Sequence, residues 1–309
     1  MIDVLRAGPL ATVQDLGREA WRDRGISRCG AVDDLALAWG NLLVGNAPGA
    51  AGVEFTLGPA TLRFETACCI ALTGTDADAT LDGRPLATWW RHRVEAGQVL
   101  KLAAPRERMR SLLAVSGGID VPLALGSRST DLKAGFGGLE GRALRDGDRL
   151  PLGPQAALPL RRIGLRPPDW TASVRVLPGP EHDDFTPASR EAFWVADWRL
   201  TPQSNRMGLR FDGPALQRDG PELPSHGVLP GVVQVPPSGQ PIVLLADAQT
   251  TGGYPKIGVV IRADLWKLAQ LRLGATLRFN PCTRDEAVAA LAERARQLEQ
   301  LRTALCMST

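Results

Sequence analysis

The sequence lacks any apolar run near the roughly 20 residues that a membrane-spanning helix needs. Its first residues, MIDVLRAGPLATVQDLGRE, contain no basic segment followed by a long apolar one, so we expect no signal peptide. The chain has one tyrosine, four lysines and five cysteines, and no Cys-x-x-Cys pair. We therefore expect no disulfide framework and no metal site, and reduced thiols favour a cytoplasmic location.

Several catalytic and nucleotide-binding motifs are also missing. There is no Gly-Lys pair, which excludes a Walker-type phosphate loop, and neither Gly-x-Ser-x-Gly nor His-Glu-x-x-His occurs. None of the lysines lies between two methionines, so we expect biotin not to be attached to this chain. The net charge of +3 and the scattered arginines give no argument for nucleic-acid or membrane binding.

What is abundant is glycine and proline, with 33 and 24 residues, separated by short apolar runs. A turn led by glycine precedes an apolar strand start in 97–103, 147–153 and 274–280. In each run leucine or phenylalanine recurs at every second position, which is the period of a strand with one buried face. The pattern predicts a mainly β, β-rich α+β fold.

Helical patterns are few. Apolar residues recur with helical spacing in 32–46, where Asp33 or Asp34 can cap the start, and in 263–271. A last helix is predicted over 283–305, where Thr283 and Glu286 form a capping box. Its apolar stripe, which we expect to pack across a barrel, consists of Leu291, Ala295, Leu298 and Leu301.

The stretch 154–170 is rich in proline, has no clean period and is typical of a connector. The β pattern begins again after it. We therefore predict a β-rich domain over 1–165, a second over 166–285 and a C-terminal helix over 286–309.

Polar residues cluster beside glycines in GSRSTD (126–131) and SNRMG (204–208). An arginine in such a loop can hold a carboxylate or phosphate in a bidentate grip. The alternative is a polar turn in which Asp131 caps backbone N–H groups, and the residues alone do not decide between the two. In TVQDLGR (12–18) an internal ion pair between Asp15 and Arg18 is the simpler expectation.

The richest cluster is DAQTTGGYP (247–255), which follows the apolar run PIVLLA. Two glycines permit close approach of a ligand to the backbone, and the amide and hydroxyl groups before them suit a neutral amide or ureido ligand. The alternative is a hydrogen-bonded hairpin loop. Gln234 stands among apolar residues, where its amide needs a partner. His226 is more simply an exposed loop residue than a base.

These segments, together with the long stretches GGIDVPLALGSRSTDLKAGFGGLEGRALRDGDRL and VVQVPPSGQPIVLLADAQTTGGYPKIGVVIRADLWKLAQL, resemble the biotin-dependent carboxyltransferase family from about residue 3 to 281. The family includes the larger half of the urea carboxylase carboxyltransferase domain, the C subunit of bacterial 5-oxoprolinase and the antagonist of a sporulation-kinase inhibitor. The sequence departs from it at Val32, where the family usually has Met, and at 273–275, where it usually has a Pro-Gly-Asp turn.

The resemblance implies two cyclophilin-like β-barrel domains and a partner, the smaller B subunit. A chain of this length without a fused biotin carboxylase most resembles the 5-oxoprolinase component, which works with the A and B subunits to open 5-oxo-L-proline to L-glutamate with ATP. The alternatives are a biotin-dependent carboxyltransferase acting on urea or a related amide, and a non-enzymatic antagonist of a kinase inhibitor similar to the B subunit.

The candidate catalytic residues are Arg128, Asp131, Arg206 and Asp247. The candidate substrate-binding residues are Ser127, Ser129, Thr130, Asn205, Gln234, Gln249, Thr250, Thr251, Gly252, Gly253 and Tyr254. We expect the arginines to bind an anionic group and the side-chain amides and hydroxyls to bind the amide of the substrate. Asp131 or Asp247 would orient an arginine or accept a proton.

Overall fold

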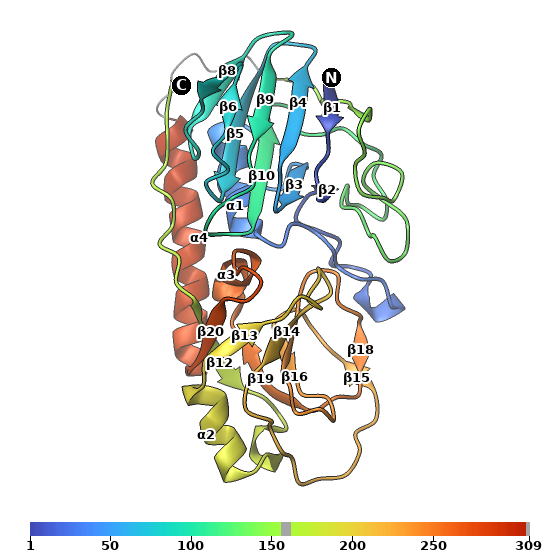
Figure 1. Ribbon diagram of the computed structural model, residues 1–309, viewed down its shortest axis with the longest axis vertical. Helices are drawn as coiled ribbons and strands as arrows, with labels where there is room; N and C mark the ends of the chain where they lie inside the picture. The colour runs from blue at the N-terminus through green and yellow to red at the C-terminus, as the bar shows by residue number, and fades with distance from the viewer. Residues whose placement is uncertain (156–161, 307–309) are drawn as a thin grey trace. The chain divides into compact units, whose positions relative to one another are not determined.

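The computed structural model describes residues 1–155 and 162–306. The chain folds as two compact units (Figure 1). Unit 1 contains Met1–Arg18, Cys29–Pro168 and the end of the chain from Gln297 on. Unit 2 contains Asp169–Arg296 and the short segment Glu19–Arg28. The connector predicted over 154–170 lies partly outside the described residues.

Unit 1 is built on two antiparallel sheets. The six-stranded sheet has the order β11 (Arg149–Leu150), β1 (Ile2–Arg6), β4 (Ala60–Phe64), β9 (Val99–Leu102), β6 (Thr80–Leu81) and β7 (Arg84–Pro85). The five-stranded sheet has the order β2 (Leu10–Gln14), β3 (Gly52–Thr56), β10 (Arg110–Val115), β5 (Cys68–Gly74) and β8 (Arg91–Val94). The hydrophobic side chains that alternate along these strands face one shared interior.

That interior is one hydrophobic core to which both sheets contribute. Ile2 and Phe64, which are direct partners in the β1–β4 pairing, enter it from one sheet, and Phe55 and Ile70 enter from the other. All four side chains are buried. Burying a side chain of this size stabilises the folded state by about 1.5–3 kcal/mol, so the apolar alternation in the sequence is what holds the two sheets together.

The helix α1 (Asp34–Leu43) covers the outer face of the five-stranded sheet and contacts β5 and β10. Asp33 caps it, since its carboxylate accepts from the N–H of Ala36 at 2.9 Å. A Cβ at Gly40 would lie 3.1 Å from Thr73 Oγ1, so glycine allows the helix to approach the sheet closely here. Because α1 lies on one face and the core on the other, every residue of β5 is buried.

Unit 2 contains a closed seven-stranded barrel. Its order is β12 (Ser173–Pro178), β19 (Lys256–Val260), β16 (Val232–Gln234), β17 (Ile242–Leu244), β14 (Gly208–Asp212), β13 (Trp198–Leu200) and β20 (Thr276–Pro281). Parallel pairing of β12 with β20 closes the ring, and the other neighbours are antiparallel. Closure leaves no unpaired edge between the first and last strands.

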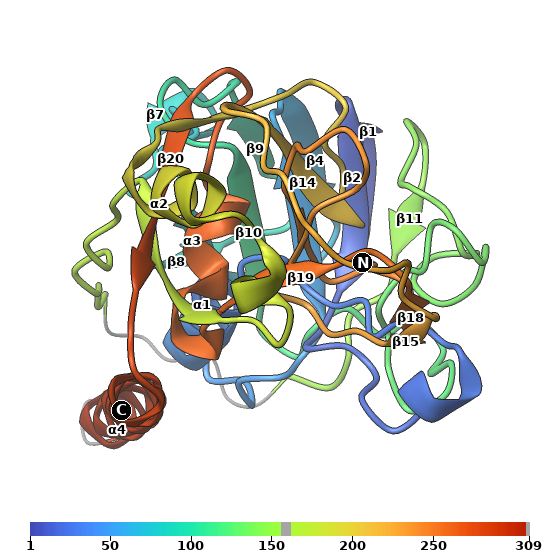
Figure 2. The same cartoon turned by 90° about the horizontal axis from the view of Figure 1, so that it is seen from below.

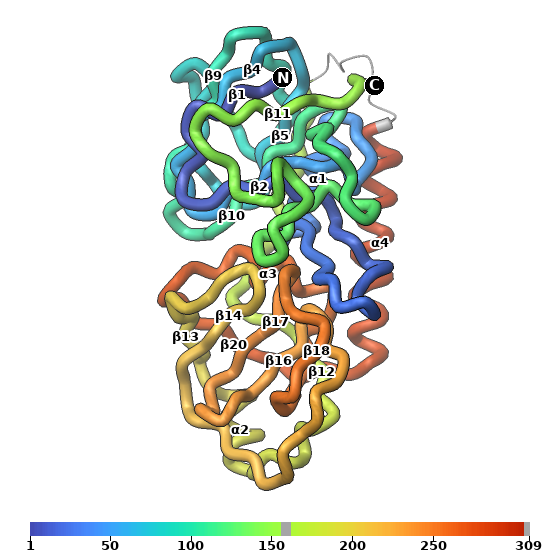
Figure 3. Tube along the Cα trace, turned by 90° about the vertical axis from the view of Figure 1, so that its right-hand side faces the viewer, coloured from blue at the N-terminus to red at the C-terminus, as the bar shows by residue number. Residues whose placement is uncertain are grey.

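Short elements surround the barrel. A two-stranded sheet pairs β15 (His226–Gly227) with β18 (Thr251–Gly252). Figure 1 labels both strands, and Figure 3 shows β18 in the tube of unit 2. The helix α2 (Pro187–Val195), which was not predicted, lies beside β20 (Figure 2). The rings of Phe193 and Phe279 stack between the two elements. The remaining helical elements are α3 (Leu265–Ala269) and the 3-10 turns η1 (Arg22–Arg24), η2 (His182–Asp184) and η3 (Arg262–Asp264).

The C-terminal helix α4 (Arg284–Cys306) begins with the predicted capping box. The backbone N–H of Thr283 donates to Glu286 at 2.7 Å, and that of Glu286 donates back to Thr283 at 3.3 Å. The apolar stripe was only half right. Leu298 and Leu301 pack against a buried cluster of unit 1, whereas Leu291 is exposed.

The prediction of a mainly β fold with a few short helices and a C-terminal helix is confirmed. Of the two β-barrel domains that the resemblance implied, unit 2 contains a closed barrel. The strands expected in 97–103, 147–153 and 274–280 are β9, β11 and β20. In unit 1 the strands are divided between two sheets that enclose a core.

The buried thiols of β5 behave as structural groups, since burial raises the pKa of Cys68 to about 12.

One buried carboxylate ties the barrel to its neighbouring turn. Asp264 of η3 accepts from the backbone N–H of Arg175 at 2.9 Å, and from its guanidinium at 2.7 and 3.0 Å. Burial by itself raises the pKa of Asp264. The hydrogen bonds from Arg175 outweigh burial, and the pKa lies below its ordinary value.

This lowered pKa predicts an acid-dependent loss of stability. The contribution of Asp264 is complete above the unfolded-state pKa near 3.8 and disappears as the pH falls through the lower folded-state value. At pH 7 we expect Asp264→Asn to cost on the order of 1–3 kcal/mol, towards the lower end because solvent screens the half-exposed Arg175.

Urea unfolding at a series of pH values between 7 and 3 measures the difference between the two proteins. The gap should narrow below about pH 4, because the Asp264 carboxyl of the unfolded wild-type chain then takes up a proton while that of the folded protein does not. Asp212→Asn, which changes an exposed carboxylate of β14, is the control and should follow wild type throughout. A gap that stays constant with pH would contradict this account.

Candidate functional site

The cluster 126–131 lies in unit 1, and most of its polar groups are bound to Asp15. The Asp15 carboxylate accepts from the hydroxyls of Ser127 at 2.7 Å and Ser129 at 2.5 Å, and from the backbone N–H of Arg128 at 2.6 Å. The N–H of Gly17 donates to it at 2.7 Å. Both serines are fully buried. These contacts give the segment a structural role.

The other members of this cluster are bound in the same way. The guanidinium of Arg128 donates to Asp120 at 2.6 Å, and Asp131 accepts from the backbone N–H groups of 133–134 at 3.1 and 2.9 Å. The hydroxyl of Thr130 donates to the Val13 carbonyl at 2.9 Å. This is the polar-turn alternative, in which Asp131 caps backbone groups. A ligand-binding role for this segment stays a prediction.

Arg18 does not pair with Asp15, so the expected internal ion pair is wrong. Its guanidinium donates to the carbonyl oxygens of Ser129 and Ala124 and lies 4.7 Å from the centre of the Phe136 ring. The four donors around Asp15 already use its oxygens. Sequence proximity suggested the pair, but the chain turns so that the 124–136 loop comes between the two charges.

In unit 2, Arg206 and Asp247 form a buried ion pair. Nε and Nη2 of Arg206 each lie 2.9 Å from a different oxygen of Asp247, and the two side chains are 4% and 5% exposed. The backbone N–H of Asp247 also donates to the Arg206 carbonyl at 3.0 Å. Asn205 accepts from the N–H of Met207 at 2.8 Å. The pair joins the loop before β14 to the loop after β17.

A cavity of about 810 Å³ lies in unit 2 between the barrel and its loops. This volume falls within the range of small-molecule sites. Of the sequence-predicted substrate residues, those that line it are Gln234, Gln249, Gly252, Gly253 and Tyr254. Thr250 and Thr251 belong to the same segment, but the lining among the described residues does not include them. Two segments that the sequence analysis singled out separately, Gln234 and 247–255, thus contribute to the same cavity.

Gln234 is the most unusual residue of the lining. It ends β16, where the pairing with β19 shifts register between Val233 and Gln234. Such a bulge re-aims a side chain. Gln234 is 2% exposed, and within the described part of the chain its carboxamide nitrogen has no hydrogen-bond partner. Leaving such a group unpaired costs about 1–3 kcal/mol, which is typical of a site that is completed by a ligand.

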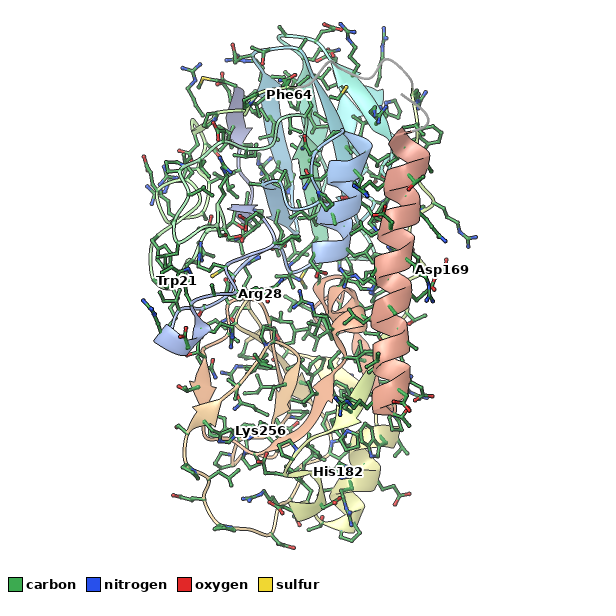
Figure 4. The ribbon with its side chains drawn as sticks, turned by 180° about the vertical axis from the view of Figure 1, so that it is seen from behind. Trp21, Arg28, Phe64, Asp169, His182 and Lys256 are labelled. Atoms are coloured by element: carbon green, nitrogen blue, oxygen red, sulfur yellow. The ribbon has the colours of Figure 1, made fainter. Side chains whose placement is uncertain are left out.

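A cluster that sequence reasoning missed lies next to Gln234. Lys256 is the direct partner of Gln234 in the β16–β19 pairing, and it is labelled in the barrel in Figure 4. Its buried ammonium lies 3.0 Å from Glu181 and also contacts Nε2 of His226, whose Nδ1 lies 2.9 Å from the Pro224 carbonyl. Glu181, Lys256 and His226 thus form one polar cluster beside Gln234.

The signal for this cluster was present in the sequence. Lys256 precedes the apolar run IGVV, and a charge in a buried strand demands a partner. Neither Glu181 nor His226 could be assigned to it, because they lie 75 and 30 residues away along the chain. His226, expected to be an exposed loop residue, is half-buried.

A closed barrel beside a cavity lined by carboxamides, a phenol and two glycines defines a β-barrel protein with a candidate site for a small polar ligand. Residues 24–281 match the family model described as carboxyltransferase domain, subdomain A and B. The chain therefore belongs to this carboxyltransferase family. No helix within residues 1–155 and 162–306 is long and apolar enough to cross a membrane.

Known proteins resemble the chain over almost its whole length. It is 52% identical to the C subunit of 5-oxoprolinase from Escherichia coli over 302 residues, 97% of each chain. It is 46% identical to the C subunit of 5-oxoprolinase from Haemophilus influenzae over 303 residues, 98% of each chain. The crystal structure of K. lactis urea amidolyase superposes with a TM-score of 0.90 at 27% identity, covering 97% of this chain and 20% of that one.

The buried pair of Arg206 and Asp247 generates a stability prediction. Arg206→Ala leaves the Asp247 carboxylate buried without the fork that compensates it, so we expect a loss of about 3–5 kcal/mol in the free energy of unfolding. The double variant Arg206→Met/Asp247→Leu removes both charges and should recover most of that loss.

Chemical unfolding of the single and double variants measures both effects. Arg210→Ala, which removes an exposed arginine from the adjacent strand β14, is the control and should change stability by less than about 0.5 kcal/mol. If the double variant is no more stable than Arg206→Ala, the expectation is wrong. The attraction within the pair would then exceed the free energy needed to remove both charges from water.

Proposed function

We propose that this chain is the C subunit of a 5-oxoprolinase and acts with the A and B subunits in the ATP-dependent opening of 5-oxo-L-proline to L-glutamate. The observation that carries the proposal is its identity of 52% to a protein of that name over 97% of both chains. The second relative of the same name, at 46% identity, also matches over nearly its full length. The reaction and the partner subunits are part of the proposal.

The cavity of unit 2 supports a lactam substrate. Amide resonance weakens the carbonyl as an electrophile, so an enzyme must bind its oxygen and orient its N–H. The lining supplies the carboxamides of Gln234 and Gln249 and the phenol of Tyr254. In contrast, the charged lining residues are Glu222 and Arg218, and Arg218 is bound to Asp184 at 2.8 Å. This lining does not fit a triphosphate, so we assign no ATP contact to it.

A biotin-dependent carboxyltransferase acting on urea is the second candidate. It is favoured by the TM-score of 0.90 with K. lactis urea amidolyase. The present chain corresponds to only 20% of that protein, so carboxybiotin would have to come from another chain. The two candidates differ in their need for biotin, and this difference can be measured.

Reconstitution tests the proposal. The chain is purified together with an A-type and a B-type subunit of 5-oxoprolinase, and glutamate and ADP are followed with 5-oxo-L-proline and ATP. We expect both products in equal amounts, no turnover when this chain is left out, and no inhibition by avidin. Urea-dependent turnover that avidin abolishes would favour the second candidate. Assembly without turnover of either substrate would contradict both and favour a binding role.

A further inference from the structure

The unpaired carboxamide nitrogen of Gln234, within the described part of the chain, indicates the ligand chemistry of the cavity. In the described structure the nitrogen of this side chain makes no hydrogen bond, although its neighbours Val233 and Val235 are buried in the barrel wall. A residue placed there for stability would be apolar or bonded. Gln234 stands at the register shift of β16 and is one of the residues that line the cavity.

Gly252 shapes the space around this amide. A Cβ built at Gly252 would lie 2.7 Å from Nε2 of Gln234, closer than side-chain atoms approach one another. Gly252 also lines the cavity and pairs with His226 in the β15–β18 sheet. A side chain at position 252 would therefore displace the carboxamide of Gln234.

We propose that Gln234 is a specificity-determining residue that recognises a cis amide, the arrangement found in a lactam. A carboxamide carries a donor N–H and an acceptor oxygen side by side. A lactam ring holds its own N–H and C=O on one edge, so the two groups form a pair of parallel hydrogen bonds. An open secondary amide is almost entirely trans, which places its donor and acceptor on opposite edges.

The cluster next to Gln234 keeps this recognition neutral. Lys256 is balanced by Glu181 at 3.0 Å and also contacts Nε2 of His226, so its positive charge is paired within the protein. Because these two charges balance each other, the surroundings of Gln234 do not favour a charged ligand over a neutral amide. The phenol of Tyr254 is 46% exposed at the mouth of the cavity, where a carboxylate on the lactam ring can stay in water. This inference rests on the proposed function for its substrate, but its ligand chemistry is independently measurable.

Kinetics of the reconstituted complex test the residue. Gln234→Leu should raise KM for 5-oxo-L-proline at least roughly tenfold, because two neutral hydrogen bonds are lost. Its melting temperature should equal or exceed that of wild type, because an unpaired buried amide is removed. Gln203→Leu, on the exposed surface of unit 2, is the matched control and should leave KM unchanged. An unchanged KM in Gln234→Leu would overturn the proposal.

A second pair of variants approaches the amide from the other side. Gly252→Ala should raise KM in the same direction, since the added methyl displaces the carboxamide. Gly227→Ala changes the paired strand of the same small sheet, where a Cβ meets nothing within 4 Å, and should behave as wild type. Equal KM values for the two alanine variants would count against the assignment.

A thermal-shift assay on the full chain separates this inference from the proposed function. 2-Pyrrolidinone, a lactam without a carboxylate, should raise the melting temperature of wild type and not of Gln234→Leu, whereas trans N-methylacetamide should shift neither. If the complex shows no lactam turnover, the proposed function is wrong. The thermal-shift measurement still shows whether Gln234 binds a cis amide. Equal shifts by the two amides, or an equal shift by 2-pyrrolidinone in wild type and Gln234→Leu, would overturn the inference.

Discussion

The closed ring of main-chain hydrogen bonds in the barrel of unit 2 is the constraint on which its candidate site depends. Each strand is paired on both sides, so a side chain that ends one strand has a fixed position relative to its neighbours. Gln234 occupies such a position, opposite Ile242 and Lys256. The ring holds a polar group against apolar walls that would otherwise exclude it, and the loops after β14 and β17 complete the cavity.

The two units use buried polar groups in opposite ways. In unit 1 the Asp15 carboxylate is satisfied by hydroxyl and backbone donors, so the segment 126–131 is rigid and self-contained. In unit 2 the nitrogen of the Gln234 carboxamide is left without a protein partner among the described residues. A satisfied network stabilises a fold, whereas an unsatisfied group reduces stability and is retained where a ligand completes it. In the sequence, both 126–131 and 247–255 are clusters of polar residues beside glycine, so the sequence does not distinguish the two roles.

Much of the fold was predictable because local signals are strong. The capping box of Thr283 and Glu286 and the cap at Asp33 depend on residues three positions apart, and both are present in the structure. The period-two leucines of 97–103 and 274–280 predicted buried strand faces, and β9 and β20 have them. The helix α2 was not predicted, because its nine residues are short and weakly apolar and its stability comes from ring packing on β20.

The sequence by itself determined the β-rich class, the helix starts at Asp33 and Thr283 and the polar character of 247–255, since these follow from neighbours along the chain. Only the tertiary structure decided which polar residues share a cavity and which are bound internally. Hydrogen-bond partners such as Asp15 and Ser129, or Lys256 and Glu181, are brought together from 114 and 75 residues apart by the pairing of strands. No local pattern encodes such a meeting, because it depends on the register and closure of the whole sheet.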